Sequence, residues 1–156
     1  MIRRAEKKDI PDVLRLLVQV NMVHHSGRPD LFKGPATKYG AEQLEKIFSD
    51  EKTPVFVFPD ENGHVAGYAF CILREVKNDR LLEDIRTLYI DDLCVDENCR
   101  GQHIGTALYR HVTAFAKEQG CHNVTLNVWA LNENAMRFYQ SLGMKMQKIG
   151  MEEILE

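Results

Sequence analysis

The chain has 156 residues, 44% hydrophobic and 28% charged, with a net charge of -3. This is ordinary for one globular domain covering residues 1–156, and so small a net charge argues against nucleic acid as the main ligand. No stretch reaches the roughly 20 apolar residues that cross a bilayer. The charged N-terminus lacks the apolar segment of a secretory signal, so we expect neither membrane association nor secretion. The four cysteines show neither metal-ligand nor redox-pair spacing, which predicts reduced thiols, no metal and a cytoplasmic location.

The N-terminal third predicts a short strand and two helices. The strand is expected at residues 2–5. Asp9 fits the N-cap and Pro11 the first turn of a helix whose apolar stripe should end before SGRPD, where Gly27 and Pro29 break it. Apolar residues at helical spacing in AEQLEKIFSD predict a second helix at residues 41–50.

The remainder alternates strands with two further helices. Two β-rich runs flank DENG, whose Asn62-Gly63 pair suits a hairpin turn, and a long strand should end at LCVD. A third helix follows and ends at Gly120, then a strand in HNVTLNVWA, a short helix closed by Gly143 and a last extended region. These elements predict the α+β class, with a mixed, mostly antiparallel twisted sheet and helices on both faces.

A glycine-bearing loop, CRGQHIGTAL, lies between the long strand and the third helix. The first helical N–H groups lack intrahelical partners and attract anions, and glycine lets the main chain approach a phosphate closely. Neither a nucleoside-triphosphate loop (GxxxxGK followed by Ser or Thr) nor a dinucleotide fingerprint is present. On the loop alone, an alternative stays open in which Gly101 makes a turn and Gly105 allows close packing.

The surrounding residues carry a resemblance to a family. LCVDENCRGQHIGTAL resembles the cofactor signature of the GNAT superfamily, the acyl-CoA-dependent N-acyltransferases, with Arg100, Gln102 and Gly105 in their expected places. His103 stands where the family usually has its first glycine. NENAMRFYQSLGM at residues 132–144 resembles the family's later motif, and one helix and one strand separate the two, as in the family.

The resemblance implies a layout for acetyl-CoA. Main-chain groups of Leu93, Cys94 and Val95 would pair with the pantetheine arm, and an N–H near the first two would polarise the thioester carbonyl. The pyrophosphate would lie on Arg100, Gly101, Gln102, His103, Ile104, Gly105 and Thr106. Asn132 would bind a pantetheine amide and Tyr139 would protonate the departing thiolate. Asn132 is also a good N-cap, and Tyr139 alone would read as an ordinary half-buried aromatic.

The acceptor amine requires a base. An amine with a pKa near 10.4 is about 3.4 units from its nucleophilic form at pH 7, roughly 4.6 kcal/mol. Some relatives place a glutamate on the strand before the second motif, where this chain has Asn127. Asp91 and Asp92 approach the thioester, and strand alternation would send one to each face. We favour Asp92 as the base and Asp91 as an acceptor contact; solvated acids are the alternative.

The HHSGRPDLF segment is the candidate acceptor pocket. His24, His25, Arg28 and Asp30 would line it, unless the segment is simply a polar turn. The acidic stretches LLED and IDD hint at a cationic acceptor. The histidines are badly spaced for a shared metal.

These observations predict an N-acetyltransferase in which a primary amine of a small molecule or peptide attacks acetyl-CoA directly, without an acyl-enzyme. Resemblance also points to a homodimer. A non-catalytic acyl-CoA-binding module of the same fold is the alternative, kept open by Asn127.

Overall fold

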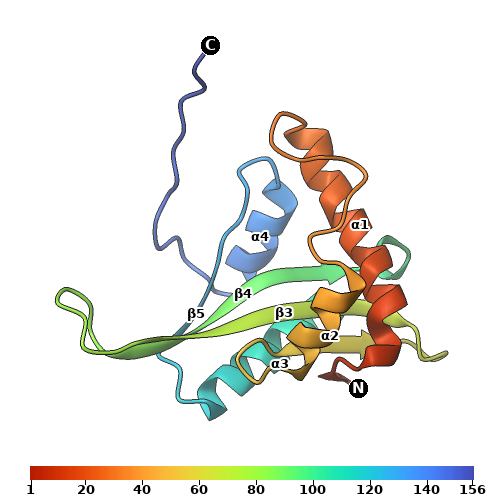
Figure 1. The fold of residues 1–156 in the computed structure, drawn as a ribbon, viewed down its shortest axis with the longest axis horizontal. Coiled ribbons are helices and arrows are strands. Elements are labelled where there is room, and N and C mark those ends of the chain that lie inside the picture. The colour runs from red at the N-terminus through yellow and green to blue at the C-terminus, as the bar shows by residue number, and fades with distance from the viewer.

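Five strands form one sheet in sequence order, and four helices pack around it (Figure 1). The structure, a computed structural model, describes all 156 residues. The strands are β1 (Arg3–Arg4), β2 (Val55–Pro59), β3 (Val65–Val76), β4 (Ile85–Val95) and β5 (Asn123–Leu126). The helices are α1 (Ile10–Gly27), α2 (Ala41–Ser49), α3 (Ile104–Glu118) and α4 (Glu133–Ser141), with 3₁₀ turns η1 (Lys7–Asp9) and η2 (Glu97–Cys99).

Strands β1 to β4 are antiparallel to their neighbours, whereas β5 runs parallel to β4 and is reached through α3. A parallel pair needs such a crossover, because a tight turn can join only antiparallel strands. The expected mixed, mostly antiparallel sheet is therefore confirmed.

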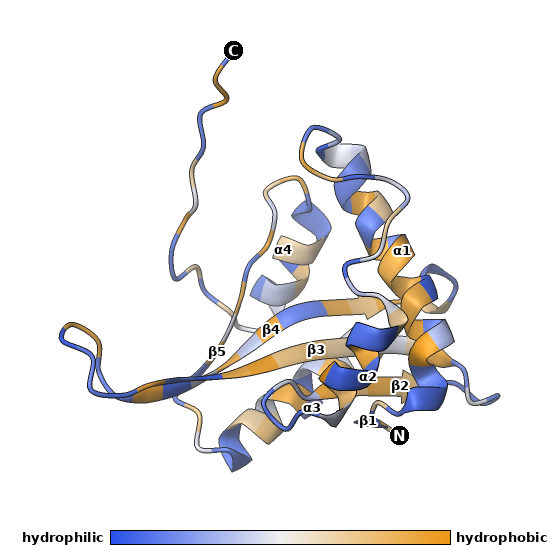
Figure 2. Ribbon diagram, in the orientation of Figure 1, coloured by the Kyte–Doolittle hydropathy of each residue, from blue (hydrophilic) through white to orange (hydrophobic).

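Each face of the sheet has its own apolar core. Along β3, Tyr68 and Phe70 face α1 and α2, while Ala69 and Cys71 face α3. Leu16, Leu17 and Leu44 complete the first core, and Leu108 and Val112 the second. Figure 2 shows the matching hydrophobic colouring of the central strands and of α1. The expectation of helices on both faces is confirmed.

Helix α1 and the last strand differ in extent from expectation. Helix α1 continues to Gly27, whereas its end was predicted before Ser26. The last strand covers only Asn123–Leu126, because the chain then turns away from β4. The C-terminal region is extended but forms no strand. None of the helices combines the length and hydropathy needed to cross a membrane.

Candidate active site

β4 and β5 separate part-way along the sheet. They pair from Thr87 with Asn123 to Ile90 with Leu126, and beyond this point residues 92–95 pair only with β3. The main chain of Leu93, Cys94 and Val95 therefore borders β3 on one side and has no strand on the other. Such an edge can accept an extended ligand through main-chain hydrogen bonds.

A β-bulge in β4 lies at this separation. Phe70 of β3 pairs with Asp92 and Cys71 with Ile90, which leaves Asp91 without an opposite residue. Asp91 accepts hydrogen bonds from Lys38 Nζ at 2.8 Å and from the Tyr39 hydroxyl at 2.7 Å. Tyr39 stacks on Phe70, which belongs to the α1–α2 face.

The predicted alternation of the two acidic side chains is therefore wrong. Asp92 accepts a 2.7 Å hydrogen bond from Tyr68, which is also on the α1–α2 face. Because the extra residue of a bulge breaks the two-residue period, Asp91 and Asp92 both turn toward this face.

Burial sets the electrostatics of Asp92. Burial raises the pKa of its carboxyl from 3.8 to about 6, with the Tyr68 hydrogen bond acting in the opposite sense. Tyr68 is fully buried, and burial followed by the Asp92 charge raises the pKa of its hydroxyl. Tyr68 thus remains a donor and holds Asp92 in a fixed orientation. A carboxyl with a pKa near 6 suits proton acceptance at neutral pH.

Tyr139 of α4 is half-buried close to the same groups. Burial raises the pKa of its hydroxyl well above its usual range, and the nearby Asp92 and Cys94 raise it further. Its ring centroid lies 5.1 Å from that of Phe138 and 6.4 Å from that of Tyr109 in α3. The hydroxyl keeps its proton at neutral pH, as a general acid requires.

The Cys94 side chain points away from the open strand edge. Its Sγ lies 3.9 Å from the carbonyl oxygen of Leu16 in α1. Burial raises the pKa of this thiol to about 12, so it is protonated at neutral pH and a poor nucleophile. The contribution of Cys94 to the cleft is its main chain.

The entrance of α3 has no capping side chain. The N-cap is His103, and the first helical hydrogen bond runs from the Ala107 N–H to its carbonyl oxygen at 3.0 Å. The N–H groups of the first turn therefore lack intrahelical acceptors and make an anion site. By contrast, the side chain of Asn132 caps α4, accepting from the Ala135 N–H at 3.1 Å.

Two residues of the loop have left-handed backbone. Gly101 has φ +84° and His103 has φ +60°. Glycine adopts this region freely, whereas among other residues Asn, Asp and His are those that tolerate it best. The preference for glycine at position 103 thus has a conformational cause, and histidine retains the loop shape.

Gly105 allows α4 to pack closely on α3. A Cβ there would lie 3.2 Å from Phe138 Cζ and 3.6 Å from Val95 Cγ2. The turn at Gly101 and the close packing at Gly105 are both present, and both are compatible with an anion site at the same helix entrance.

Side chains of α1 hydrogen-bond the start of the segment that joins β4 to α3. Asp96, only 6% exposed, accepts from Arg15 Nη1 at 2.6 Å and from the Asn98 N–H at 3.1 Å. Gln19 donates to the same carboxylate at 3.4 Å and accepts from the Glu97 N–H at 3.3 Å. Sequence reasoning missed this contact, because no local pattern joins residues about 80 positions apart.

Comparison with known proteins identifies the family. Residues 20–144 match the model of the acetyltransferase (GNAT) family. The chain belongs to this family. The streptothricin acetyltransferase of Streptomyces lavendulae is 32% identical over 104 residues, 67% of this chain and 50% of that protein. The chain spans between 26% and 62% of the length of the curated relatives compared.

Solved structures share the GNAT fold over the whole chain. A mutant of the BH1408 protein from Bacillus halodurans is 33% identical and superposes with a TM-score of 0.96, covering 100% of this chain and 99% of that one. An aminoglycoside N-acetyltransferase crystallised with CoA has the same fold, with a TM-score of 0.74 at 14% identity over 100% of this chain and 99% of that one.

The predicted acceptor segment makes several polar contacts within the protein. His25 Nδ1 hydrogen-bonds the Phe32 carbonyl oxygen at 2.7 Å. Arg28 pairs with Asp30 at 2.7 Å and with Glu152 of the C-terminal segment. The polar groups of His25, Arg28 and Asp30 are thus engaged within the protein, and the structure shows no contact from them to Asp91 or Asp92.

A cluster of three aromatic rings includes residues of the predicted acceptor segment. The His24 ring lies 4.9 Å from that of Phe32, which lies 5.1 Å from that of Trp129 in the loop between β5 and α4. Burial, followed by the Lys38 charge, lowers the pKa of His24. His24 was named as a candidate pocket residue, but its proximity to Trp129 was not predicted; the only clue was a single tryptophan near the end of a predicted strand.

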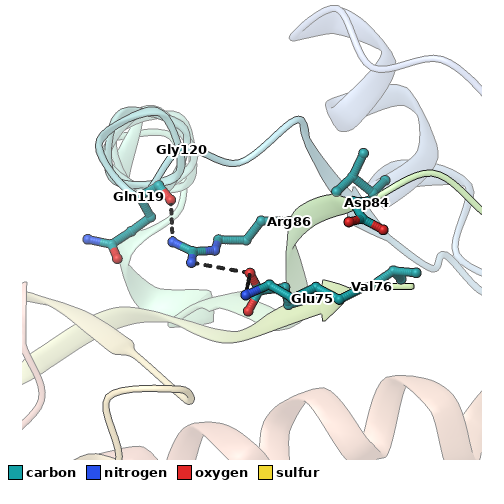
Figure 3. Close-up of a pocket in the computed structure, with 8 residues that line it drawn as sticks. Glu75, Val76, Asp84, Arg86, Gln119 and Gly120 are labelled. Atoms are coloured by element: carbon teal, nitrogen blue, oxygen red, sulfur yellow. Dashed lines mark hydrogen bonds and ion pairs between the residues drawn. The ribbon is translucent and has the colours of Figure 1, made fainter. Parts of the chain in front are cut away.

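A further hollow of about 290 Å³ lies at the opposite end of β4 (Figure 3). Arg86 there donates to the Gln119 carbonyl oxygen at 2.7 Å and lies 3.5 Å from Glu75 Oε1. Arg86 and Lys77 both pair with Glu75, and Asp84 accepts a hydrogen bond from the Asn78 N–H, so the charged groups of this hollow are engaged within the protein. No group of three His, Cys, Asp or Glu side chains is arranged to hold a metal ion.

Proposed function

We propose that the protein transfers the acetyl group of acetyl-CoA to a primary amine by direct attack. The observation that carries this is the presence of a carboxyl of pKa about 6, Asp92, and a nearby protonated hydroxyl, Tyr139, beside an open strand edge. The first group is suited to accepting a proton near neutral pH and the second to donating one.

The free main-chain groups support the proposed binding of acetyl-CoA. Leu93, Cys94 and Val95 would pair with the pantetheine arm along the open edge of β4. The seven residues from Arg100 to Thr106 would hold the pyrophosphate at the uncapped entrance of α3. Asn132 uses its side-chain oxygen to cap α4, which leaves its NH₂ group to donate to a pantetheine carbonyl.

The proposed reaction has a balanced proton path. The amine arrives as an ammonium ion and loses a proton to Asp92; a lysine-like amine lies roughly 4.6 kcal/mol from its nucleophilic form at pH 7, and this cost forms part of the barrier. The amine attacks the thioester carbonyl, which is polarised by a main-chain N–H near Leu93. The tetrahedral intermediate collapses with cleavage of the C–S bond, and Tyr139 gives its proton to the leaving thiolate. The second proton of the amine nitrogen then restores the Tyr139 hydroxyl, and the first passes from Asp92 to solvent. Because the Cys94 thiol is buried and protonated, it is unsuited to carrying the acetyl group.

Charge and aromatic surface favour a cationic acceptor. Asp91 and Asp92 turn toward one face, where Lys38 Nζ already occupies an ammonium position 2.8 Å from Asp91. The half-exposed Trp129 and its neighbours provide an apolar wall. Relatives named for streptothricin and for thialysine suit an amine of this kind, either small or part of a peptide. Four free cysteines fit a reducing compartment, which we take to be the cytoplasm.

Thiol release with a panel of primary amines tests the proposal. Wild type should release CoA with at least one amine, and Tyr139→Phe should lower kcat about 10²-fold or more with little change in acetyl-CoA affinity. Tyr109→Phe, which changes the neighbouring tyrosine on α3, is the matched control and should retain activity. Tight acetyl-CoA binding without turnover of any amine would instead favour a non-catalytic binding module.

A further inference from the structure

Lys38 lies in the loop between α1 and α2 and reaches the bulge of β4. Its Nζ donates a 2.8 Å hydrogen bond to Asp91 Oδ1, and the neighbouring Tyr39 hydroxyl donates to Asp91 Oδ2 at 2.7 Å. The side chain of Lys38 is 50% exposed, whereas that of Asp91 is only 12% exposed. A primary amine of the protein itself therefore lies against a mostly buried carboxylate beside the candidate active site.

The charge of this amine acts on two other parts of the site. Burial is the main cause of the raised pKa of Asp92, while the Tyr68 hydrogen bond and then the Lys38 charge oppose it. Burial, followed by the Lys38 charge, lowers the pKa of His24 in the aromatic cluster. Lys38 is thus within electrostatic range of both the proposed base and the aromatic side chains near the acceptor segment.

The proposed thioester position is a short distance further along β4. Leu93 follows Asp91 by two residues, which is about 7 Å at about 3.3 Å per residue of strand. Lysine has a flexible four-carbon stem, and Lys38 belongs to a loop rather than to a helix or strand. Rotation of this stem can carry Nζ from Asp91 past Asp92 to the open edge without any movement of the sheet.

No other lysine has such a position. Among the lysines that form ion pairs, Lys7, Lys8 and Lys77 pair with acids outside β4, and only Lys38 pairs with a residue of this strand. Lys33 belongs to the same loop and is exposed, but its side chain forms no ion pair. An amine on a short flexible tether has an effective concentration on the order of 1 mM, so Lys38 competes well with free amines.

We propose that Lys38 is an acetylation site, modified by the active site of its own chain when acetyl-CoA is bound. This inference rests on the proposed function, because it uses the same base, acid and thioester position. The product carries an acetyl group on Nζ and has lost the positive charge that pairs with Asp91.

The step is balanced in atoms and protons. Asp92 takes one proton from the Lys38 ammonium, and the free amine forms an N–C bond to the thioester carbonyl carbon. The C–S bond breaks, and Tyr139 gives its proton to the leaving thiolate. The second proton of the Lys38 nitrogen restores the Tyr139 hydroxyl. The products are the amide at Lys38 and free CoA, with one proton passing from Asp92 to solvent.

The test incubates the purified full-length chain with acetyl-CoA alone and locates the acetyl groups gained by peptide mass spectrometry. Wild type should gain one at Lys38, with a rate constant independent of protein concentration. Asp92→Asn and Tyr139→Phe should each modify Lys38 about 10²-fold more slowly. Lys38→Arg keeps the charge and should gain no acetyl group in this loop. Lys33→Arg is the matched control and should still be modified at Lys38.

A mixing experiment distinguishes transfer within one chain from transfer between chains. Isotope-labelled Asp92→Asn, mixed with unlabelled wild type, should gain no more acetyl groups at Lys38 than it does alone. Labelling of the variant at the wild-type rate would overturn the proposal. An unmodified Lys38 in wild type, or equal rates in wild type and both active-site variants, would also overturn it.

Release of CoA with external primary amines separates this inference from the proposed function. Turnover of an external amine without modification of Lys38 would refute the self-acetylation alone and leave the proposed function intact. If neither Lys38 nor any external amine were acetylated, both would fail. Modification of Lys38 in wild type, slowed in Asp92→Asn, would support both.

Discussion

The Tyr68 hydroxyl donates a hydrogen bond of 2.7 Å to Asp92 Oδ2. Tyr68 lies wholly inside the core, whereas Asp92 stands at the edge where β4 and β5 separate. A core residue therefore fixes the carboxylate that we propose as the general base. Because the bond is made from a rigid strand, the proton acceptor is positioned before any substrate arrives.

Activity should depend on the ionisation of Asp92. Its carboxyl must be charged to accept a proton, and burial raises its pKa to about 6. At saturating acetyl-CoA, kcat should therefore fall as the pH decreases through about 6. Asp92→Asn should lower kcat by roughly 10²- to 10⁴-fold and remove this acidic limb. A pH profile of kcat for both proteins checks this, and an unchanged acidic limb in the variant would assign the base elsewhere.

The same substitution should stabilise the folded chain near neutral pH. The pKa of Asp92 is higher in the folded state, about 6 against 3.8, so the folded state binds the proton more tightly. In wild type, proton binding to Asp92 therefore stabilises the folded state fully below about pH 3.8, and this contribution is lost as the pH rises through about 6. Asp92→Asn should gain roughly 1–3 kcal/mol over wild type at pH 8 and nothing at pH 3.5. Denaturant unfolding at both values measures the difference, and an equal gain at both would exclude a charge effect.

The contact between α3 and α4 should tolerate no side chain at Gly105. An added Cβ would lie 3.2 Å from Phe138 Cζ. Gly105→Ala should therefore cost about 1–3 kcal/mol of unfolding free energy through overpacking. Phe138→Leu in the same chain should recover part of the loss. A double-mutant cycle by thermal unfolding measures the coupling, and strictly additive effects would show that the two residues do not compete for space.

The loop network of Arg15 and Asp96 should affect cofactor affinity rather than chemistry. Arg15 holds Asp96, whose carboxylate orders the main chain just before Arg100. Arg15→Met should raise the KM for acetyl-CoA about 3- to 10-fold with kcat within twofold, since this side chain is 43% exposed and its ion pair is partly screened. Arg110→Met, on the exposed side of α3, is the control. A loss confined to kcat would exclude a positioning role for the network.

Features set by interactions between residues close in the sequence could be predicted, whereas features set by contacts between distant residues could not. The helix around Leu108 and the hairpin at Gly63 were predicted correctly, because periodicity and turn chemistry are local. The motif around Gly105 also located the helix entrance. The orientation of Asp91 was predicted wrongly, because an extra residue in β4 is visible only once β3 is paired with it.

The side chains of the acceptor segment illustrate the same limit. Arg28 pairs with Glu152, which lies 124 positions away, and the sequence does not predict this contact. Trp129 contacts Phe32 across a comparable separation. Both contacts arise from tertiary packing, and neither produces a local sequence signal.

A crystal structure of the protein with CoA tests the central claim most directly. The diphosphate should lie on the N–H groups of Gly105 and Thr106, and the pantetheine arm along residues 93–95. The thiol should then lie within reach of the Tyr139 hydroxyl. A CoA molecule bound elsewhere on the protein, or a diphosphate without contact to the entrance of α3, would contradict it.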